Sequence, residues 1–98
     1  MRGIIYCFKG INNNLIYIGS SKQSIASRRA KHIYDSKHSK RCKPVHKTIL
    51  ENGGFNEFQI QILKEVDVED LQLLHLHEKK IIEDYKNNSN YVLMNTYH

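Results

Sequence analysis

Two short runs near the start of the chain, Gly3-Ile4-Ile5-Tyr6 and Tyr17-Ile18-Gly19, decide its fold. Between them lies a cluster of turn-forming residues, Gly-Ile-Asn-Asn-Asn at positions 10–14. Apolar, β-branched and aromatic residues flank this cluster on both sides, which is the pattern of two strands joined by a tight connection. The segment therefore predicts a β-hairpin.

The two tyrosines of this hairpin are expected to share one face. A connection with an even number of residues places Tyr6 opposite Gly19 and Tyr17 opposite Phe8. Side chains two positions apart on a strand lie on the same side, so the two phenol rings are diagonal neighbours. Two hydroxyl groups held together on a rigid support, followed by a basic segment, are typical of an active site.

The rest of the chain predicts one small α+β domain that covers residues 1–98. Strands are expected at residues 3–9, 15–19 and 55–63, and helices at 24–36, 44–52 and 67–85. Pro44 fits the first turn of the second helix, and Asp67 fits the N-cap of the third. This order, ββααβα, predicts a small three-stranded antiparallel sheet flanked by helices. Residues 91–94 could add a short closing segment.

Composition excludes several other classes of protein. The chain is 40% hydrophobic and 26% charged, and no apolar run approaches the ~20 residues of a membrane-spanning helix. The N-terminus enters a predicted strand without a signal-peptide pattern. Cys7 and Cys42 are too few for a disulfide framework, so both are expected to be reduced thiols. An intracellular protein, cytoplasmic or nuclear, is expected.

Positive charge is concentrated in the first half of the chain. Residues 1–50 hold eleven Lys or Arg and one acid, a sum of +10, whereas residues 51–98 hold four Lys and nine acids, a sum of −5. Such a concentration favours a surface for a polyanion over a solvated face or an anionic membrane. The candidate phosphate-contacting residues are Lys22, Arg29, Lys31, Lys37, Lys40, Arg41 and Lys43.

One carboxylate stands out on physical grounds. In the last helix, residues at a 3-4-3-4 spacing should line the buried face, and the third of them is an acid. The five residues are Leu71, Leu74, Glu78, Ile81 and Tyr85. A carboxylate on such a face needs a cation, hydrogen-bond donors or a metal ion. The alternative is a glutamate at the edge of the stripe that reaches solvent or pairs with a lysine.

Taken together, these motifs resemble the GIY-YIG nuclease family, which is named for the two hairpin runs. In that family, an arginine and often a histidine four residues later follow on the first helix, as Arg28 and His32 do here. A glutamate on a later helix matches Glu78, and an asparagine near the end matches Asn95. One departure is the doubled isoleucine of the first run, which leaves the role of Gly3 open.

The resemblance implies a role for each charged residue of the site. Glu78 would be the ligand of one divalent cation, Mg²⁺ or Mn²⁺, with waters and substrate phosphate completing its shell. Arg28 would hold a phosphate and offset the charge that develops on it. His32 would orient a tyrosine hydroxyl or carry a proton.

The resemblance also assigns the tyrosines. One of Tyr6 and Tyr17 would take a proton from the attacking water and the other would position it, with Tyr6 slightly favoured as the base. Nearby cations would lower the pKa of that phenol. Asn95 would support the metal site or a backbone turn. Gly19, which lacks a side chain, would let the backbone or the substrate approach closely.

The sequence therefore predicts a metal-dependent endonuclease that hydrolyses DNA phosphodiester bonds. A non-catalytic nucleic-acid-binding module of the same fold is the main alternative. A small basic RNA-associated structural protein would explain the charge, but not Glu78 or the tyrosine pair. DNA is the expected partner and a membrane is not. The chain is expected to act alone, as a homodimer, or fused to a separate DNA-binding domain.

Overall fold

A computed structural model describes residues 2–38 and 40–95 of the chain. Its elements follow the order β1 (Arg2–Gly10), β2 (Leu15–Ser21), α1 (Ile25–Ser36), α2 (Pro44–Glu51), a 3₁₀ turn (Phe55–Glu57), β3 (Phe58–Asp67), α3 (Leu71–Lys86) and β4 (Val92–Leu93). No helix in the described ranges is long and apolar enough to cross a membrane. The expected α+β class is confirmed.

The N-terminal hairpin forms in the expected register. β1 and β2 pair antiparallel, with Tyr6 opposite Gly19 and Phe8 opposite Tyr17. β3 pairs antiparallel with the other edge of β1, so β1 lies between β2 and β3 in the sheet. The register between β1 and β3 shifts beside Tyr6, where Leu63 is an extra residue on β3. A bulge of this kind bends the strand locally.

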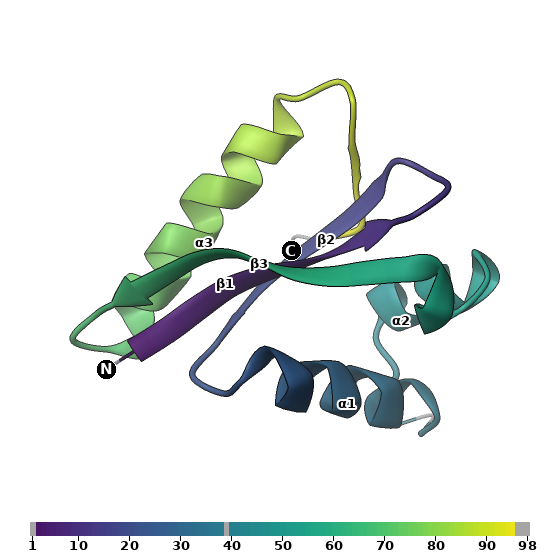
Figure 1. The fold of residues 1–98 in the computed structure, drawn as a ribbon, viewed down its shortest axis with the longest axis horizontal. Helices are drawn as coiled ribbons and strands as arrows, with labels where there is room; N and C mark the ends of the chain where they lie inside the picture. Colours follow the sequence, from purple (N-terminus) through teal and green to yellow (C-terminus); the bar gives the residue numbers. More distant parts are fainter. Residues whose placement is uncertain (1, 39, 96–98) are drawn as a thin grey trace.

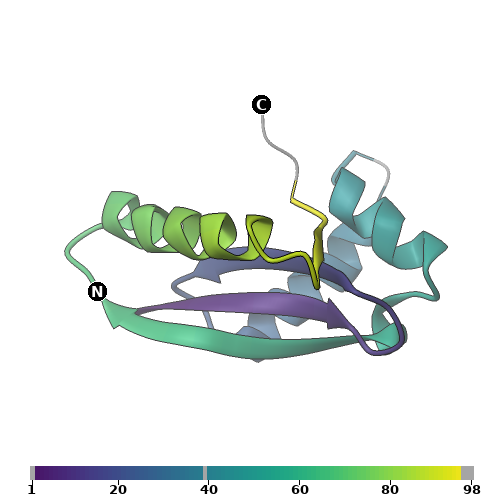
Figure 2. The same cartoon turned by 90° about the horizontal axis from the view of Figure 1, so that it is seen from above.

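The helices lie on both faces of the sheet (Figures 1 and 2). α3 covers one face, where Leu74 and Ile82 pack against apolar side chains that include Ile5 and Ile18. α1 and α2 lie on the other side, over a second cluster that holds Tyr6, Phe8, Val45, Ile49 and Phe55. Alternate residues of β1 therefore belong to different cores, and both tyrosines face α1.

The prediction of three antiparallel strands was incomplete. The sheet has four strands in the order β3-β1-β2-β4, and β4 runs parallel to β2. Only Leu15 and Ile16 of β2 have strand partners in β4. A two-residue strand has no alternating pattern of its own, so its pairing depends on where the end of α3 delivers the chain.

Two predicted elements have different boundaries in the structure. Residues 55–57 form a 3₁₀ turn, and β3 continues to Asp67 because it pairs with the whole length of β1. α3 begins at Leu71, and its N-cap is Asp70, whose carboxylate accepts a hydrogen bond from the Leu73 N–H at 3.0 Å. Leu71 was expected on the buried stripe, but at the first position of the helix it is 43% exposed.

Candidate active site

Tyr6 stands at the centre of a buried polar cluster. Its hydroxyl oxygen lies 2.8 Å from Nε2 of His32 and 3.4 Å from a guanidinium nitrogen of Arg28. Both partners come from α1, four residues apart, so the helix presents them on one face. Tyr6 and His32 are almost completely buried, at 1% and 3% exposure. The structure thus brings together three of the residues that the sequence proposes as catalytic.

Tyr17 joins this cluster from the neighbouring strand. Its ring centre lies 5.8 Å from that of His32, and the Tyr6 ring centre lies 6.0 Å from it. Both contacts are edge-to-face, which is a favourable geometry for aromatic rings. Tyr17 is half-buried, whereas Tyr6 lies beneath it. The two tyrosines therefore share a face and a neighbour.

Gly19 provides the room for the Tyr6 ring. A Cβ atom placed on Gly19 would lie 2.5 Å from the Tyr6 hydroxyl oxygen and 2.6 Å from the ring carbon that carries it. Real side chains do not approach so closely. The Tyr6 ring could not easily move away, because it is buried and held by hydrogen bonds. The absent side chain thus serves Tyr6, while contact with nucleic acid at Gly19 remains a prediction. Gly3 has a similar role against Leu74 of α3.

His46 is a member of the cluster that sequence reasoning missed. It is fully buried at the start of α2, and its Nε2 lies 2.9 Å from Nδ1 of His32. Its own Nδ1 accepts a hydrogen bond from the Lys43 backbone N–H at 3.1 Å. Two histidines fourteen positions apart in different helices share no periodic pattern. The one local signal was its third position in α2, from which a side chain can reach the N-cap backbone.

The two buried histidines, His32 and His46, are neutral at pH 7. Burial, reinforced by the charge of Arg28, lowers the pKa of His32 to about 3. Burial also lowers the pKa of His46, although the nearby Asp35 carboxylate opposes it. Each imidazole therefore has one N–H and one acceptor nitrogen.

The expectation for the Tyr6 phenol was wrong in direction for the free protein. Its pKa is raised from the ordinary value, because burial outweighs the hydrogen bond and the charge of Arg28, and the charge of Glu78 adds to the rise. Neighbouring cations were visible in the sequence, but the depth of the phenol was not. A ligand that brings further positive charge would act against this rise.

Arg28 has a hydrogen-bond donor to spare. Its Nε is buried and has no acceptor within the described residues. The structure thus leaves one N–H of a guanidinium without a protein partner, next to the Tyr6 hydroxyl. A buried unsatisfied donor costs about 1–3 kcal/mol, so holding Arg28 in this place has a cost in stability.

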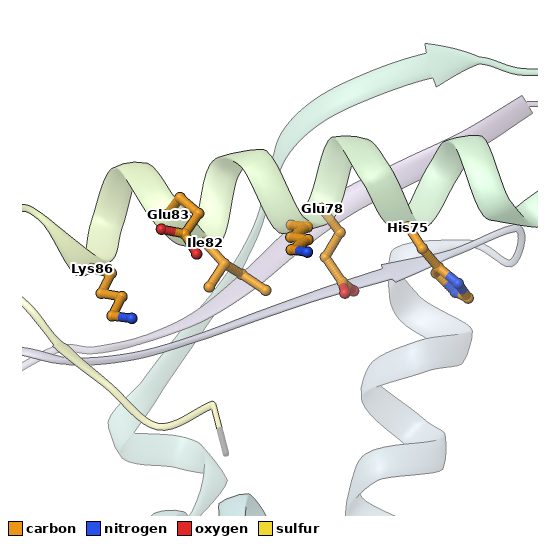
Figure 3. Close-up of a pocket in the computed structure, with 6 residues that line it drawn as sticks. His75, Glu78, Ile82, Glu83 and Lys86 are labelled. Atoms are coloured by element: carbon orange, nitrogen blue, oxygen red, sulfur yellow. The ribbon is translucent and has the colours of Figure 1, made fainter. Parts of the chain in front are cut away.

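Glu78 belongs to α3, which covers the face of the sheet opposite to the cluster. Figure 3 shows its side chain pointing from α3 towards β2, on the same side of the helix as His75. The pocket they line measures about 370 Å³ and also includes Ile82, Glu83 and Lys86. Glu78 is half-buried, and no hydrogen bond or ion pair occupies its carboxylate among residues 2–38 and 40–95. Burial is the main cause of the raised pKa of Tyr6, and the Glu78 charge adds the smallest contribution to it.

A single carboxylate in this setting fits a hard divalent cation. No group of three or more His, Cys, Asp or Glu side chains converges within the described part of the chain. Zinc and similar metals are usually held by such groups. Mg²⁺ instead keeps several waters and binds through one or two carboxylates together with substrate phosphates. The unpaired Glu78 carboxylate and the open pocket before it meet that need.

Asn95 is occupied with the backbone of β2. Its side-chain oxygen accepts a hydrogen bond from the Ile18 N–H at 3.0 Å, and its amide group donates to the Ile18 carbonyl at 2.8 Å. It thereby continues the pairing of β4 beyond Leu93 and fixes β2 between Tyr17 and Gly19. Of the two roles that the sequence left open, the geometry matches support of the backbone.

The basic residues lie mainly on the outer surface of α1 and in the connection to α2. Lys22, Lys37, Lys40, Arg41 and Lys43 are exposed, and Arg29 is half-buried. Lys31 is exposed too, but its ammonium group lies 3.6 Å from Asp35. These cations surround the helix that carries Arg28 and His32. Their contact with nucleic acid remains a prediction.

Comparison with known proteins identifies the class. The model of the GIY-YIG catalytic domain matches residues 2–91, and the chain therefore belongs to the GIY-YIG family. Among solved structures, it is similar to the catalytic domain of the homing endonuclease I-TevI, with a TM-score of 0.71 and 24% identity over 96% of this chain and 99% of that one. A mutant of that domain gives a TM-score of 0.72 at 24% identity, over 100% and 98% of the two chains. These likenesses establish the fold.

A viral protein is similar in sequence. The MSV199 domain-containing protein 146R of Invertebrate iridescent virus 6 is 33% identical over 84 residues, which are 86% of this chain. The match covers 34% of that protein, so the chain spans about a third of the length of its curated relative.

Proposed function

We propose that this chain is a metal-dependent endonuclease that hydrolyses DNA phosphodiester bonds. One observation carries the proposal: a phenol, a guanidinium and an imidazole meet in one buried cluster, where the Tyr6 oxygen lies 2.8 Å from His32 and 3.4 Å from Arg28. Membership of the GIY-YIG family and the likeness to a homing endonuclease catalytic domain support the same reaction.

In the proposed mechanism, Arg28 and Tyr6 act together on the scissile phosphate. Arg28, whose side chain is half-buried, donates guanidinium N–H groups to a phosphate oxygen and offsets the charge that grows there. Tyr6 takes a proton from the attacking water, and Tyr17, which is more exposed, orients that water. Bound cations and the Arg28 charge favour the phenolate that this step requires.

Glu78 would hold the divalent cation, Mg²⁺ or Mn²⁺. Such an ion supplies Lewis-acid stabilisation to the leaving 3′ oxygen when bound. Glu78 would hold it from α3, and Asn95 keeps β2 in place through its two hydrogen bonds to Ile18. The exposed cations around α1 would track the DNA backbone.

The test is cleavage of plasmid DNA with Mg²⁺ or Mn²⁺, with EDTA as the blank, by the native chain and by Glu78→Gln. The substitution removes a ligand charge while nearly preserving shape, so the fold and DNA binding should survive and cleavage should fall by about 10²-fold or more. Glu83→Gln, the same change in the same pocket, is the matched control and should cut normally.

Two outcomes would contradict the proposal. If Glu78→Gln folds, binds DNA and cuts at the native rate, Glu78 does not hold the cation. If the native chain binds DNA but never cuts it with either metal, the chain is a binding module, which the exposed basic surface would serve equally well.

The proposal extends to the longer protein in which such a chain would act. The 84 matched residues are 34% of the curated relative, which favours a domain that works fused to a further region over a stand-alone domain or a homodimer.

A further inference from the structure

A continuous line of hydrogen bonds joins the start of α2 to the Tyr6 phenol. It runs from the Lys43 backbone N–H to Nδ1 of His46 at 3.1 Å, from Nε2 of His46 to Nδ1 of His32 at 2.9 Å, and from Nε2 of His32 to the Tyr6 oxygen at 2.8 Å. Both histidines are buried, so water does not compete along this line.

The direction of this line follows from its first member. A backbone N–H donates only, so Nδ1 of His46 must be an acceptor, and the single proton of that neutral ring lies on Nε2. This N–H then donates to Nδ1 of His32, which in turn keeps its proton on Nε2 and donates to the Tyr6 oxygen. We infer that the Lys43 backbone N–H fixes both histidines as Nε2–H tautomers, and that His46 is a positioning residue for Tyr6.

The opposite direction of donation, from His32 to His46, is ruled out by the contact between His46 and the Lys43 N–H. It would let an Arg28 N–H donate to Nε2 of His32, but these atoms are 3.5 Å apart, at the outer limit of a hydrogen bond. It would also put the His46 proton on Nδ1, 3.1 Å from the Lys43 backbone nitrogen, so that two N–H donors would face each other. Arg28 has the Tyr6 oxygen, at 3.4 Å, as another acceptor. The polarity set at Lys43 therefore prevails.

The consequence concerns the proton of Tyr6. Its oxygen receives an N–H from His32 and another from Arg28, so its own O–H has no acceptor in this line. His32 is then a donor that stabilises the phenolate, and it does not remove the phenol proton. Asp35, whose Oδ1 is buried without a partner in the described chain, is the nearby acid that acts on both rings.

The first test needs neither substrate nor variant. Long-range ¹H–¹⁵N NMR correlations of the histidine rings in the full chain distinguish the two tautomers. We expect unprotonated Nδ1 and protonated Nε2 in both His32 and His46. A protonated Nδ1 in His32 would overturn the inference, whatever the chain does to DNA.

The second test asks whether His46 imposes this state. His46→Leu keeps the volume and removes the donor, so His32 should become a mixture of tautomers. Since this part of the inference rests on the proposed function, we expect kcat for plasmid cleavage to fall on the order of 10²-fold while KM stays the same. Ile49→Val, a change in the same core that leaves the line intact, controls for lost stability.

The outcomes separate the two proposals. A pure Nε2–H tautomer of His32 and an unchanged kcat in His46→Leu would overturn the positioning role. If the tautomers are as expected but the native chain does not cleave DNA, the inferred direction of the hydrogen bonds is right and the proposed function is wrong. If His46→Leu does not fold, His46→Gln, which keeps an N–H donor near His32, replaces it and should retain most of kcat.

Discussion

His32 is an imidazole held neutral among cations and aromatic rings, and this has a cost at low pH. Its pKa of about 3 lies below the ordinary 6.5, because burial and the Arg28 charge disfavour the imidazolium. Below pH 6.5 the unfolded chain binds a proton that the folded chain does not. Stability contributed by neutral His32 is therefore present above about pH 6.5 and is lost as the pH falls towards 3.

We accordingly expect the free energy of unfolding to fall between pH 6.5 and pH 3 by up to about 1.4 kcal/mol per pH unit for this one histidine. Urea unfolding at several pH values measures the slope. His32→Gln should flatten it, whereas Ile49→Val should lower stability equally at every pH. A native slope that His32→Gln leaves unchanged would contradict the buried neutral state of His32.

Gly19 offers a steric test of the Tyr6 position. In Gly19→Ala the new methyl group would lie 2.5 Å from the Tyr6 oxygen, so the ring must move away from His32 and Arg28. We expect a loss of about 1–3 kcal/mol in stability from overpacking, and a loss of cleavage of about 10²-fold from the displaced phenol.

The control for Gly19→Ala is Gly54→Ala. Gly54 has a φ of +87° and nothing within 4 Å of a Cβ, so alanine there strains the backbone without touching the site. It should lower stability by about 1–2 kcal/mol and leave the cleavage rate of the folded protein unchanged. Equal loss of cleavage in both variants would mean that Gly19 matters for stability alone.

Local patterns predicted the elements that carry the site, but not the contacts made between elements. Glycine and asparagine around alternating apolar residues gave the hairpin and its register, and helical spacing placed Arg28 beside His32. A short segment was expected at residues 91–94, but its parallel pairing with β2 and the role of His46 were not predicted, because a two-residue strand and a single histidine have no period. The direction of the Tyr6 pKa was missed for a related reason, since burial depends on α1 and the sheet together.

The junction between β2 and the end of the chain depends on one amide side chain. In Asn95→Asp, the group that donates to the Ile18 carbonyl at 2.8 Å becomes an oxygen that repels it. We expect a loss of about 1–3 kcal/mol in urea unfolding and faster hydrogen exchange at the Met94 N–H, which donates to Ile16 at 2.7 Å. Asn90→Asp, the same change in an exposed turn, should have little effect.

The whole molecule is electrostatically divided: residues 22–47, which include α1, hold nine Lys or Arg and one acid, whereas residues 51–98 hold four Lys and nine acids. A nucleic acid should therefore approach the α1 side, where Arg28 and the tyrosines lie, and α3 should present only Glu78 and its neighbours to it. The charge division thus orients the DNA towards the cluster before any specific contact forms.

Salt dependence tests this orientation. Each phosphate contact releases counterions, so log K for duplex DNA should fall linearly with log salt, with a slope of about −0.9 per contact. Changing Lys37, Lys40 and Lys43 together to Glu should weaken binding and make this slope shallower by roughly two to three units. The matched control reverses three exposed cations at the other end of the molecule, Arg2, Lys64 and Lys80. It changes the net charge equally and should leave the slope nearly unchanged. Equal slopes for the two triple variants would show that DNA responds to net charge alone and that the α1 surface does not track the backbone.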